Sequence, residues 1–569
     1  MPGSVRMLVL ITLVSMLLMM AISVAGSEGS DSANGYTPVP IKVVDHSELF
    51  QEAGITKYEG SKSCIECHRD EVVEVFHSYH YQMASKAGDV YGKGEVLVGG
   101  RVVYNDFCTV MFLDNGNKPF NWIGYVVLKK APQGYEDLVG SFTGLTGCSM
   151  CHGVGMGLPP SWEPSREQLE NIDCIACHVD PSVYVSGPKA IGKGLKNVTK
   201  DEEGRWRYVI NVPADEIAKN IIDKPKTENC LACHAYSGGG PHLKRPNLGP
   251  DMMTGKTEDG RIFDVHIASG LTCTDCHPGE DHRYSTESVD TWSREGEERG
   301  EVTLQCSSCH GEEPHDGAKG WFLNTFHDKV ACQTCHIPYI AHGDWPTEYY
   351  RDWSATTFHP DKKRWKFSIP DPETGNTSEW HLFKNLEPVY AWYNGEREVY
   401  LMTDKVTPIK DSDLELDPVN GESAGVVYYV KPVGSKDDPE AKIYPFKLHR
   451  AIIPFSTSEG KPVPMKVGIA FATGDAKAAA SKGSQISGIE WDGETYVTYV
   501  RYMQVNHGVQ PADNALQCLN CHGPTVRRMP WPELGYGHFP EIAFTAITLG
   551  LVIAIIGVPL WYFKLRKKA

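Results

Sequence analysis

The pattern Cys-x-x-Cys-His occurs eight times in this chain of 569 residues. From 17 cysteines and 22 histidines, chance would produce about 0.02 copies. Covalent haem attachment explains the pattern, because two thiols bond to the haem vinyl groups and the adjacent imidazole becomes an axial iron ligand. Zinc knuckles and disulfides pair cysteines without needing a histidine after every second one. The sequence therefore predicts eight covalently bound haem c groups and a redox function.

The motifs supply both the attachment thiols and the proximal iron ligands. The predicted attachment residues are Cys64, Cys67, Cys148, Cys151, Cys174, Cys177, Cys230, Cys233, Cys273, Cys276, Cys306, Cys309, Cys332, Cys335, Cys518 and Cys521. The predicted proximal ligands are His68, His152, His178, His234, His277, His310, His336 and His522.

Histidines outside the motifs are numerous enough to provide distal ligands. A low-spin electron-transfer haem usually takes a second imidazole. Of the 22 histidines, eight belong to the motifs and fourteen lie outside them. Bis-histidine ligation of most haems is therefore feasible. One cysteine, Cys108, also lies outside the motifs, in VVYNDFCTVMF. It is either a small buried hydrophobic residue or a reactive thiol beside a substrate haem.

Both ends of the chain are apolar. Residues 1–26 combine a basic start, an apolar run and small residues, which predicts a signal peptide. Residues 540–563 predict a transmembrane anchor, and the basic tail 564–569 predicts a cytoplasmic end. We therefore expect a single-pass protein of the cell membrane, with its haem domain on the periplasmic or extracellular side.

Residues 27–539 form the predicted haem-bearing body. We expect a mostly α, loop-rich multihaem fold with few short strands, a haem-packed core and one C-terminal transmembrane helix. Residues 337–505 lack haem motifs, and runs such as VVYYVKPV and TYVTYVRYM predict a partly β insertion there. SREQLENIDCIACH predicts helix. The net charge is -17 and no basic stripe is present, which argues against a nucleic-acid partner.

Several segments around the motifs resemble the octahaem tetrathionate reductase family, among them YNDFC, ENCLACHAYSGGG, DVHIASGLTCTDCH, YPFKLHRAIIP and HGVQPADNALQCLNCH. The resemblance implies seven bis-histidine haems and one haem, at the second motif, with a distal lysine. Counting from the fourth motif, that lysine is Lys244, and Lys226 is a weaker candidate. The family's substrate pocket also implies roles for Asn105 and Cys108. The implied distal histidines are His80, with His77 as its competitor, and His266, His282, His315, His327, His449 and His507.

The resemblance implies reduction of tetrathionate or a related small sulfur or nitrogen oxyanion. Electrons would come from a quinol-linked or cytochrome donor, and a thiolate at Cys108 could attack the substrate sulfur. Two alternatives stay open: a nitrite or hydroxylamine reductase, and an electron conduit with no substrate of its own. The family has an aspartate where this chain has Pro241, and Arg245 follows Lys244 where the family tends to have histidine. These departures place the substrate in question more than the fold.

Overall fold

The structure is a computed structural model. It describes residues 38–110, 151–152, 162–200, 206–238, 240–286, 305–355, 357–359, 364–366, 382–473, 475–522 and 528–538, and the single positions 540, 542, 546, 550 and 561. The predicted signal peptide at 1–26 and the tail at 564–569 lie outside the described residues, as does Cys148.

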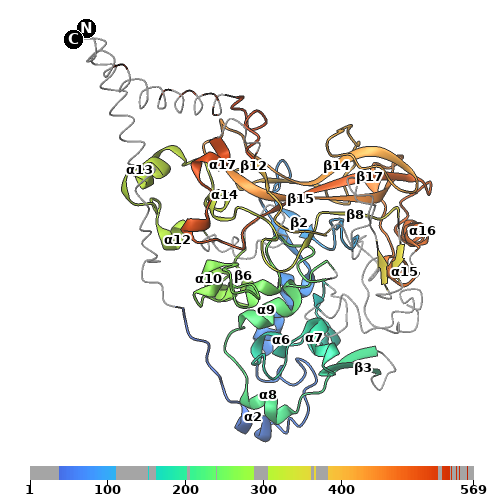
Figure 1. Cartoon of the computed structure of the whole chain (residues 1–569). Helices are drawn as coiled ribbons and strands as arrows, with labels where there is room; N and C mark the ends of the chain where they lie inside the picture. The colour runs from blue at the N-terminus through green and yellow to red at the C-terminus, as the bar shows by residue number, and fades with distance from the viewer. Residues whose placement is uncertain are drawn as a thin grey trace.

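A seven-stranded sheet dominates the upper part of the molecule (Figure 1). Its main path runs β12-β15-β17-β14-β13; β17 is antiparallel to β15 and parallel to β14, and β8 and β16 also pair with β15. The strands are β8 (Tyr350–Asp352), β12 (Val389–Tyr393), β13 (Arg397–Val399), β14 (Glu422–Pro432), β15 (Lys442–Ser456), β16 (Lys461–Pro462) and β17 (Thr495–Gln504).

The three long strands form because their sequences are rich in β-branched and aromatic residues, which suit a pleated, buried surface. Almost every residue from Ile443 to Ser456 is buried or half-buried, so β15 is covered on both faces. Its neighbours contribute Tyr429, Val430 and Tyr499 to the largest apolar core. The runs VVYYVKPV and TYVTYVRYM lie in β14 and β17, so the strands predicted there are confirmed.

Most haem motifs form a single helical turn. A spacing of i, i+3 and i+4 brings both cysteines and the histidine to one helix face. The helical motifs are α6 (Ile175–His178), α9 (Thr227–His234), α11 (Cys273–Cys276), α12 (Ser307–His310), α14 (Cys332–His336) and α17 (Cys518–His522). In Figure 1, α6 and α9 lie below the sheet and α14 and α17 lie beside β12.

The remaining elements are short. The helices are α2 (Ser47–Glu52), α3 (Arg69–His77), α4 (Tyr79–Gln82), α5 (Arg166–Leu169), α7 (Gly187–Gly192), α8 (Ala214–Lys219), η4 (Pro250–Met253), α10 (Val265–Ala268), α13 (Gly317–Phe326), α15 (Val467–Thr473), α16 (Ala476–Ser487) and η7 (Ala512–Asn514). The strand pairs are β1 (Ala84–Ala87) with β2 (Val96–Gly99), β3 (Lys196–Lys200) with β4 (Trp206–Ile210), β5 (Gly279–Glu280) with β6 (Arg283–Tyr284), β7 (Thr347–Glu348) with β11 (Leu382–Phe383), and β9 (Thr357–His359) with β10 (Arg364–Lys366).

The prediction of a mostly α fold with few short strands is wrong. The structure is 28% helical and 21% strand, and β14, β15 and β17 have 11, 15 and 10 residues. The longest described helix, α16, has 12. The physical reason is that a haem motif needs only one helical turn, while the aromatic segments between residues 422 and 504 pair into long strands. The loop-rich character is as expected.

The prediction of a C-terminal transmembrane helix, and with it a single-pass membrane location, is also corrected. Among the residues that the structure describes, no helix is both long and apolar enough to cross a bilayer. Of the stretch 540–563, positions 540, 542, 546, 550 and 561 alone are described. Apolar composition by itself therefore does not establish a membrane-spanning helix here.

Candidate haem array and reduction site

Six predicted distal histidines each face the histidine of a motif. In every pair the ring centroids are 5.9 to 6.2 Å apart. An iron between two imidazole nitrogens, each roughly 2 Å away, would separate the ring centres by about 6 Å. The distances therefore fit bis-histidine haem. The pairs are His80 with His234, His282 with His178, His266 with His310, His507 with His277, His315 with His336, and His327 with His522.

The seventh pair differs from the prediction. His46, just before α2, lies beside His68 of the first motif with a centroid separation of 6.4 Å. His46 is 18 positions before Cys64 in the sequence, and no local pattern distinguishes it from other spare histidines. His449, predicted as a distal ligand, is instead buried against Asp106 and faces no motif histidine in the described structure.

Hydrogen bonds orient several of these rings. The Nδ1 atom of His46 lies 2.8 Å from the carbonyl of Val44, that of His277 lies 2.9 Å from the carbonyl of Ser285, and that of His282 lies 2.9 Å from a Glu74 carboxylate oxygen. A hydrogen bond at Nδ1 fixes the ring and leaves Nε2 directed at a metal, as is usual for histidine ligands. The side chains present thus fit axial ligation of haem iron.

The attachment thiols show how the motifs are arranged in space. We number the motifs one to eight along the chain. In space, motifs one, three, four, five, six, seven and eight follow one another as neighbours, and motif two lies beside motif four. In each pair one thiol lies close enough to shift the pKa of the other: Cys64 with Cys174, Cys177 with Cys233, Cys230 with Cys273, Cys276 with Cys309, Cys306 with Cys332, Cys335 with Cys521, and Cys151 with Cys233.

Lys244 lies in the loop after α9, close to motif two. Burial and, to a smaller extent, the positive charge of Lys244 lower the pKa of His152 to about 4. Burial and the charges of Arg501 and Arg245 lower the pKa of the Lys244 amine to about 7. A neutral amine has a lone pair free for iron, so the environment of Lys244 suits a ligand.

Two features hold the Lys244 loop in place. The Nζ of Lys447 on β15 donates to the carbonyls of Leu243 at 3.0 Å and Lys244 at 2.9 Å, and to the hydroxyl of Thr347 at 2.8 Å. Gly238 has a φ of +87°, and a Cβ there would come within 3.0 Å of the Lys244 Cβ. The loop therefore requires glycine at 238, which the Gly-rich run of the sequence supplies.

Asn105 and Cys108 belong to one tight turn. The Asn105 Oδ1 accepts from the Phe107 amide at 2.9 Å, and the Asn105 carbonyl accepts from the Cys108 amide at 3.1 Å. Hydrogen bonds from β8 and from the residue after it hold the turn in place. Arg351 donates to the Phe107 carbonyl at 2.6 Å, and Trp353 donates to the Asp106 carbonyl at 2.9 Å. Asn105 thus shapes the turn that carries Cys108.

Cys108 lies within electrostatic reach of Lys244. Burial raises the pKa of the Cys108 thiol, although Lys244 and Arg351 act in the opposite direction. Burial therefore favours the neutral thiol over the thiolate.

Four cationic side chains surround the ring of Phe107. Their charged groups lie 4.9 to 5.8 Å from the ring centroid, and His449 stacks on the ring at 4.2 Å. The cations come from the loop after α9, from β8, from β15 and from β17, so the sheet assembles them. They are Lys244, Arg351, Lys447 and Arg501.

Two buried carboxylates complete the site. Asp106 lies 2.8 Å from Arg501, and Glu348 pairs with Arg351 through two bonds of 2.7 and 2.8 Å. The Pro241 substitution therefore does not leave Lys244 without carboxylates nearby. Sequence reasoning missed both residues. Asp106 stands inside the quoted segment YNDFC, but Glu348 is about 240 residues away and reaches the site through the fold alone.

Residues 350–525 match the family described as "Cytochrome c bacterial", and residues 262–337 match "Cytochrome c7 and related cytochrome c". The crystal structure of octaheme cytochrome c from Shewanella oneidensis superposes with a TM-score of 0.58, covering 90% of this chain and 97% of that one at 24% identity. This chain belongs to the multihaem c-type cytochromes. An uncharacterized protein of Archaeoglobus fulgidus is 61% identical over 280 residues, which is 49% of this cytochrome and 92% of the relative.

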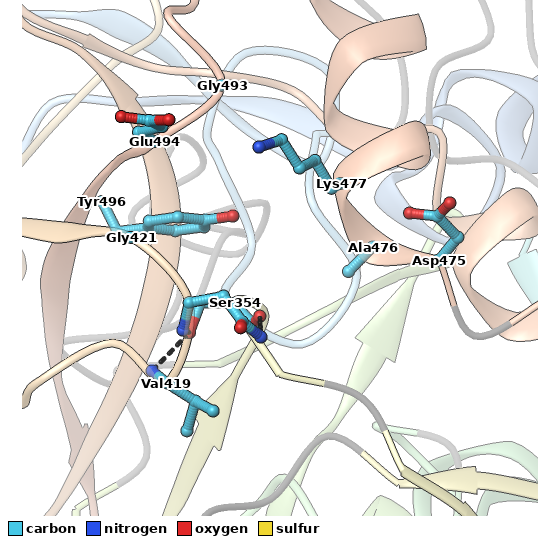
Figure 2. A pocket seen from close by; sticks show the side chains of 10 residues that line it. Ser354, Val419, Gly421, Asp475, Ala476, Lys477, Gly493, Glu494 and Tyr496 are labelled. Carbon is cyan, nitrogen blue, oxygen red and sulfur yellow. Dashed lines mark hydrogen bonds between the residues drawn. The ribbon is translucent and has the colours of Figure 1, made fainter.

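A separate cavity of about 620 Å³ lies at the α16 end of this cytochrome's sheet. Figure 2 shows Lys477 of α16 and Tyr496 of β17 pointing toward the space between them. None of the residues predicted to bind haem or substrate lines this cavity.

Proposed function

We propose that the chain carries eight haem c groups and reduces a small oxyanion at the haem held by His152 and Lys244. The observation that carries the proposal is the set of four basic side chains around Phe107, next to Cys108. One of the four, Lys244, has a lowered pKa. In this proposal His46, whose ring lies 6.4 Å from that of His68, is the seventh distal histidine, and His449 is not an iron ligand.

Charge supports an anionic substrate. As an iron ligand Lys244 would be neutral, so the cations at the site are Arg351, Lys447 and Arg501. They outnumber the two carboxylates, Asp106 and Glu348, each of which is paired with an arginine. A buried site with excess positive charge is stabilised by an incoming anion and concentrates anions from solution. Sulfur and nitrogen oxyanions have this charge and are small enough to approach an iron.

Lys244 supports substrate reduction over simple electron transfer. When bound, haem supplies electrons to the substrate. An amine is a weaker iron ligand than an imidazole, so Lys244 can yield its position to an oxyanion. Hydrogen bonds to backbone carbonyls keep Arg351 and Lys447 in place, so their positive charges remain beside the site and attract an anion.

We propose tetrathionate, nitrite and hydroxylamine as the compounds to test. Cleaving the sulfur–sulfur bond of tetrathionate could use Cys108 as nucleophile, but the attacking species must be a thiolate. Electrons would come from a quinol-linked or cytochrome donor. Because haem c is attached after export, we place the haem-bearing body outside the cytoplasm.

The test compares two lysines that precede and follow motif four. Lys244→Ala should leave one haem five-coordinate or water-bound and lower oxyanion turnover with reduced methyl viologen by about 100-fold or more. Lys226→Ala is the matched control, since the Lys226 Nζ is engaged by Asp180 at 2.6 Å. Unchanged spectra in Lys244→Ala would remove Lys244 from the haem.

The alternative to the reductase function is a protein that only transfers electrons. If the parent protein exchanges electrons with dyes but reduces no oxyanion, the chain transfers electrons without a substrate of its own, and the proposed reductase function is rejected.

A further inference from the structure

A buried ion pair lies between motifs one, three and four. The Lys196 Nζ is 3.5 Å from Asp173 Oδ2, and both side chains are 0% exposed. Tyr184 donates to the same carboxylate at 2.7 Å and Tyr58 donates to it at 3.4 Å. Burial raises the pKa of Asp173, and Lys196 and the two tyrosines oppose that shift because they stabilise the carboxylate. The pair therefore places a negative and a positive charge inside the protein.

The Asp173 end of the pair faces motifs three and one. Asp173 directly precedes Cys174, the first cysteine of motif three. Tyr58, which donates to Asp173, also accepts from the Ile175 amide inside that motif at 3.3 Å. The hydrogen bond between Cys174 and Cys64 of motif one affects the pKa of these two thiols most, and the negative charge of Asp173 acts to raise both. The carboxylate is therefore felt at both motifs.

The Lys196 end of the pair faces motif four. The Lys196 Nζ donates to the Ser186 hydroxyl at 3.5 Å. The next residue, Gly187, packs directly on motif four, since a Cβ there would lie 2.6 Å from a carbonyl oxygen of that motif. The hydrogen bond from the motif-two thiol lowers the pKa of Cys233 most; among the charges, Lys196 lowers it and outweighs Asp173, which raises it. Motif four therefore experiences the positive end of the pair.

Charges of opposite sign act in opposite directions on an electron. Haem, when bound, accepts the electron at each motif, and reduction makes the iron less positive by one charge. A neighbouring carboxylate opposes that change and a neighbouring ammonium favours it. The buried setting strengthens both effects, because the protein interior screens charges less than water does. An electron is therefore more stable at motif four than at motif three, and its transfer between them breaks no bond and moves no proton.

We infer that the buried Asp173–Lys196 pair directs electrons from motifs one and three toward motif four. Motif four lies beside motif two through Cys233 and Cys151, so electrons collect next to the proposed site of reduction. The inference goes beyond the proposed function, because the pair favours motif four whether the final acceptor is an oxyanion or another protein. A role in placing electrons also accounts for two charges at a position where apolar side chains would be at least as stable.

The experiment removes both charges together and measures haem potentials. Asp173→Asn with Lys196→Met keeps the size of both side chains and leaves no unpaired buried charge, so the variant should fold. His80→Met marks the haem of motif four and His282→Met marks that of motif three, since the iron–sulfur absorption band of each marker reports one haem. At a fixed applied potential, the ratio of reduced to oxidised haem should fall about threefold at motif four and rise about threefold at motif three. The combined change of about tenfold corresponds to about 59 mV for one electron.

An exposed ion pair on α8 provides the matched control. The Lys219 Nζ lies 3.3 Å from Asp215 Oδ2, with side chains 57% and 74% exposed. Asp215→Asn with Lys219→Met makes the same change of charge where water screens it, and should leave both ratios as in the parent.

A further titration needs no methionine marker. In the charge-free Asp173→Asn, Lys196→Met protein, one haem midpoint should move up and another should move down. Unchanged midpoints, or shifts of the same sign at motifs three and four, would overturn the inference. Opposite shifts in a protein that reduces no oxyanion would support the inference and reject the proposed reductase function alone.

Discussion

Single histidines decide which haem is complete. His46, just before α2, and His80, in α4, lie in the same N-terminal part of the sequence. They nevertheless face different motifs, the first and the fourth. The motif histidines could be assigned from spacing alone, since the spacing is the chemistry of attachment. Distal ligands could not, because any histidine that the fold brings within reach will serve, and His46 has no sequence pattern of its own.

Replacing His46 with Ala should open the iron of motif one. We expect one haem to become high-spin in the oxidised protein, with the remaining haems low-spin, because one axial imidazole is lost. Electron paramagnetic resonance measures this directly. The same experiment on His449→Ala should produce no high-spin haem, since His449 contacts Asp106 and Phe107. A high-spin signal from His449→Ala alone would reverse the two assignments.

Lys447 positions Lys244 without touching iron. Lys447→Met keeps the length of this 1% exposed side chain but removes three hydrogen bonds, and should destabilise the protein by about 2–4 kcal/mol. It should also lower the fraction of haem with a lysine ligand, measured by near-infrared magnetic circular dichroism. Lys431→Met, at an exposed position on β14, is the control and should change neither quantity.

At the scale of elements, alternation and composition located β14 and β17, but not how they assemble. Their parallel pairing, and the insertion of β17 between β14 and β15, depend on residues dozens of positions apart. Glu348, Arg351, Lys447 and Arg501 reach one point because β7, β8, β15 and β17 carry them there. Local sequence patterns therefore do not predict that these residues meet at one site.

Helix α16 packs closely on the segment before α15. A Cβ at Gly483 would lie 1.8 Å from the Pro464 carbonyl oxygen, a contact with backbone that cannot move aside easily. Gly483→Ala should therefore cost about 2–3 kcal/mol of unfolding free energy in chemical denaturation. Gly488 ends the same helix with φ +75° and open space around it, so Gly488→Ala should cost only about 1 kcal/mol. Equal costs would show that α16 shifts to accommodate the methyl group.

Asp352 on β8 links stability to pH. Burial raises its pKa to about 6, against an ordinary value of 3.8. Between these values the folded protein binds more protons than the unfolded chain, so its stability should fall as pH rises from about 4 to about 6. The change attributable to this group is at most about 3 kcal/mol. Denaturation midpoints at each pH should decline less steeply in Asp352→Asn; an unaltered decline would assign it to other groups.

At the scale of the whole molecule, motif four is where motif two, the proposed site of reduction, meets the other motifs. Cys233 interacts with both Cys151 and Cys177, and Cys230 with Cys273. His80→Met should raise the potential of the motif-four haem and so slow electron arrival at the motif-two haem at least about tenfold by making the next step uphill. Stopped-flow spectroscopy of the reduced protein mixed with oxyanion measures this. His327→Met, at motif eight, should leave that step unchanged.

The number of haem motifs also limits how many electrons one substrate molecule can receive at the proposed site of reduction. With haem on every motif, seven other irons can be reduced before the substrate arrives, and nitrite needs six electrons to become ammonium. A fully charged molecule can therefore complete the reduction during a single residence of the substrate, without waiting for its donor to return. Partly reduced and reactive nitrogen species need never leave the protein.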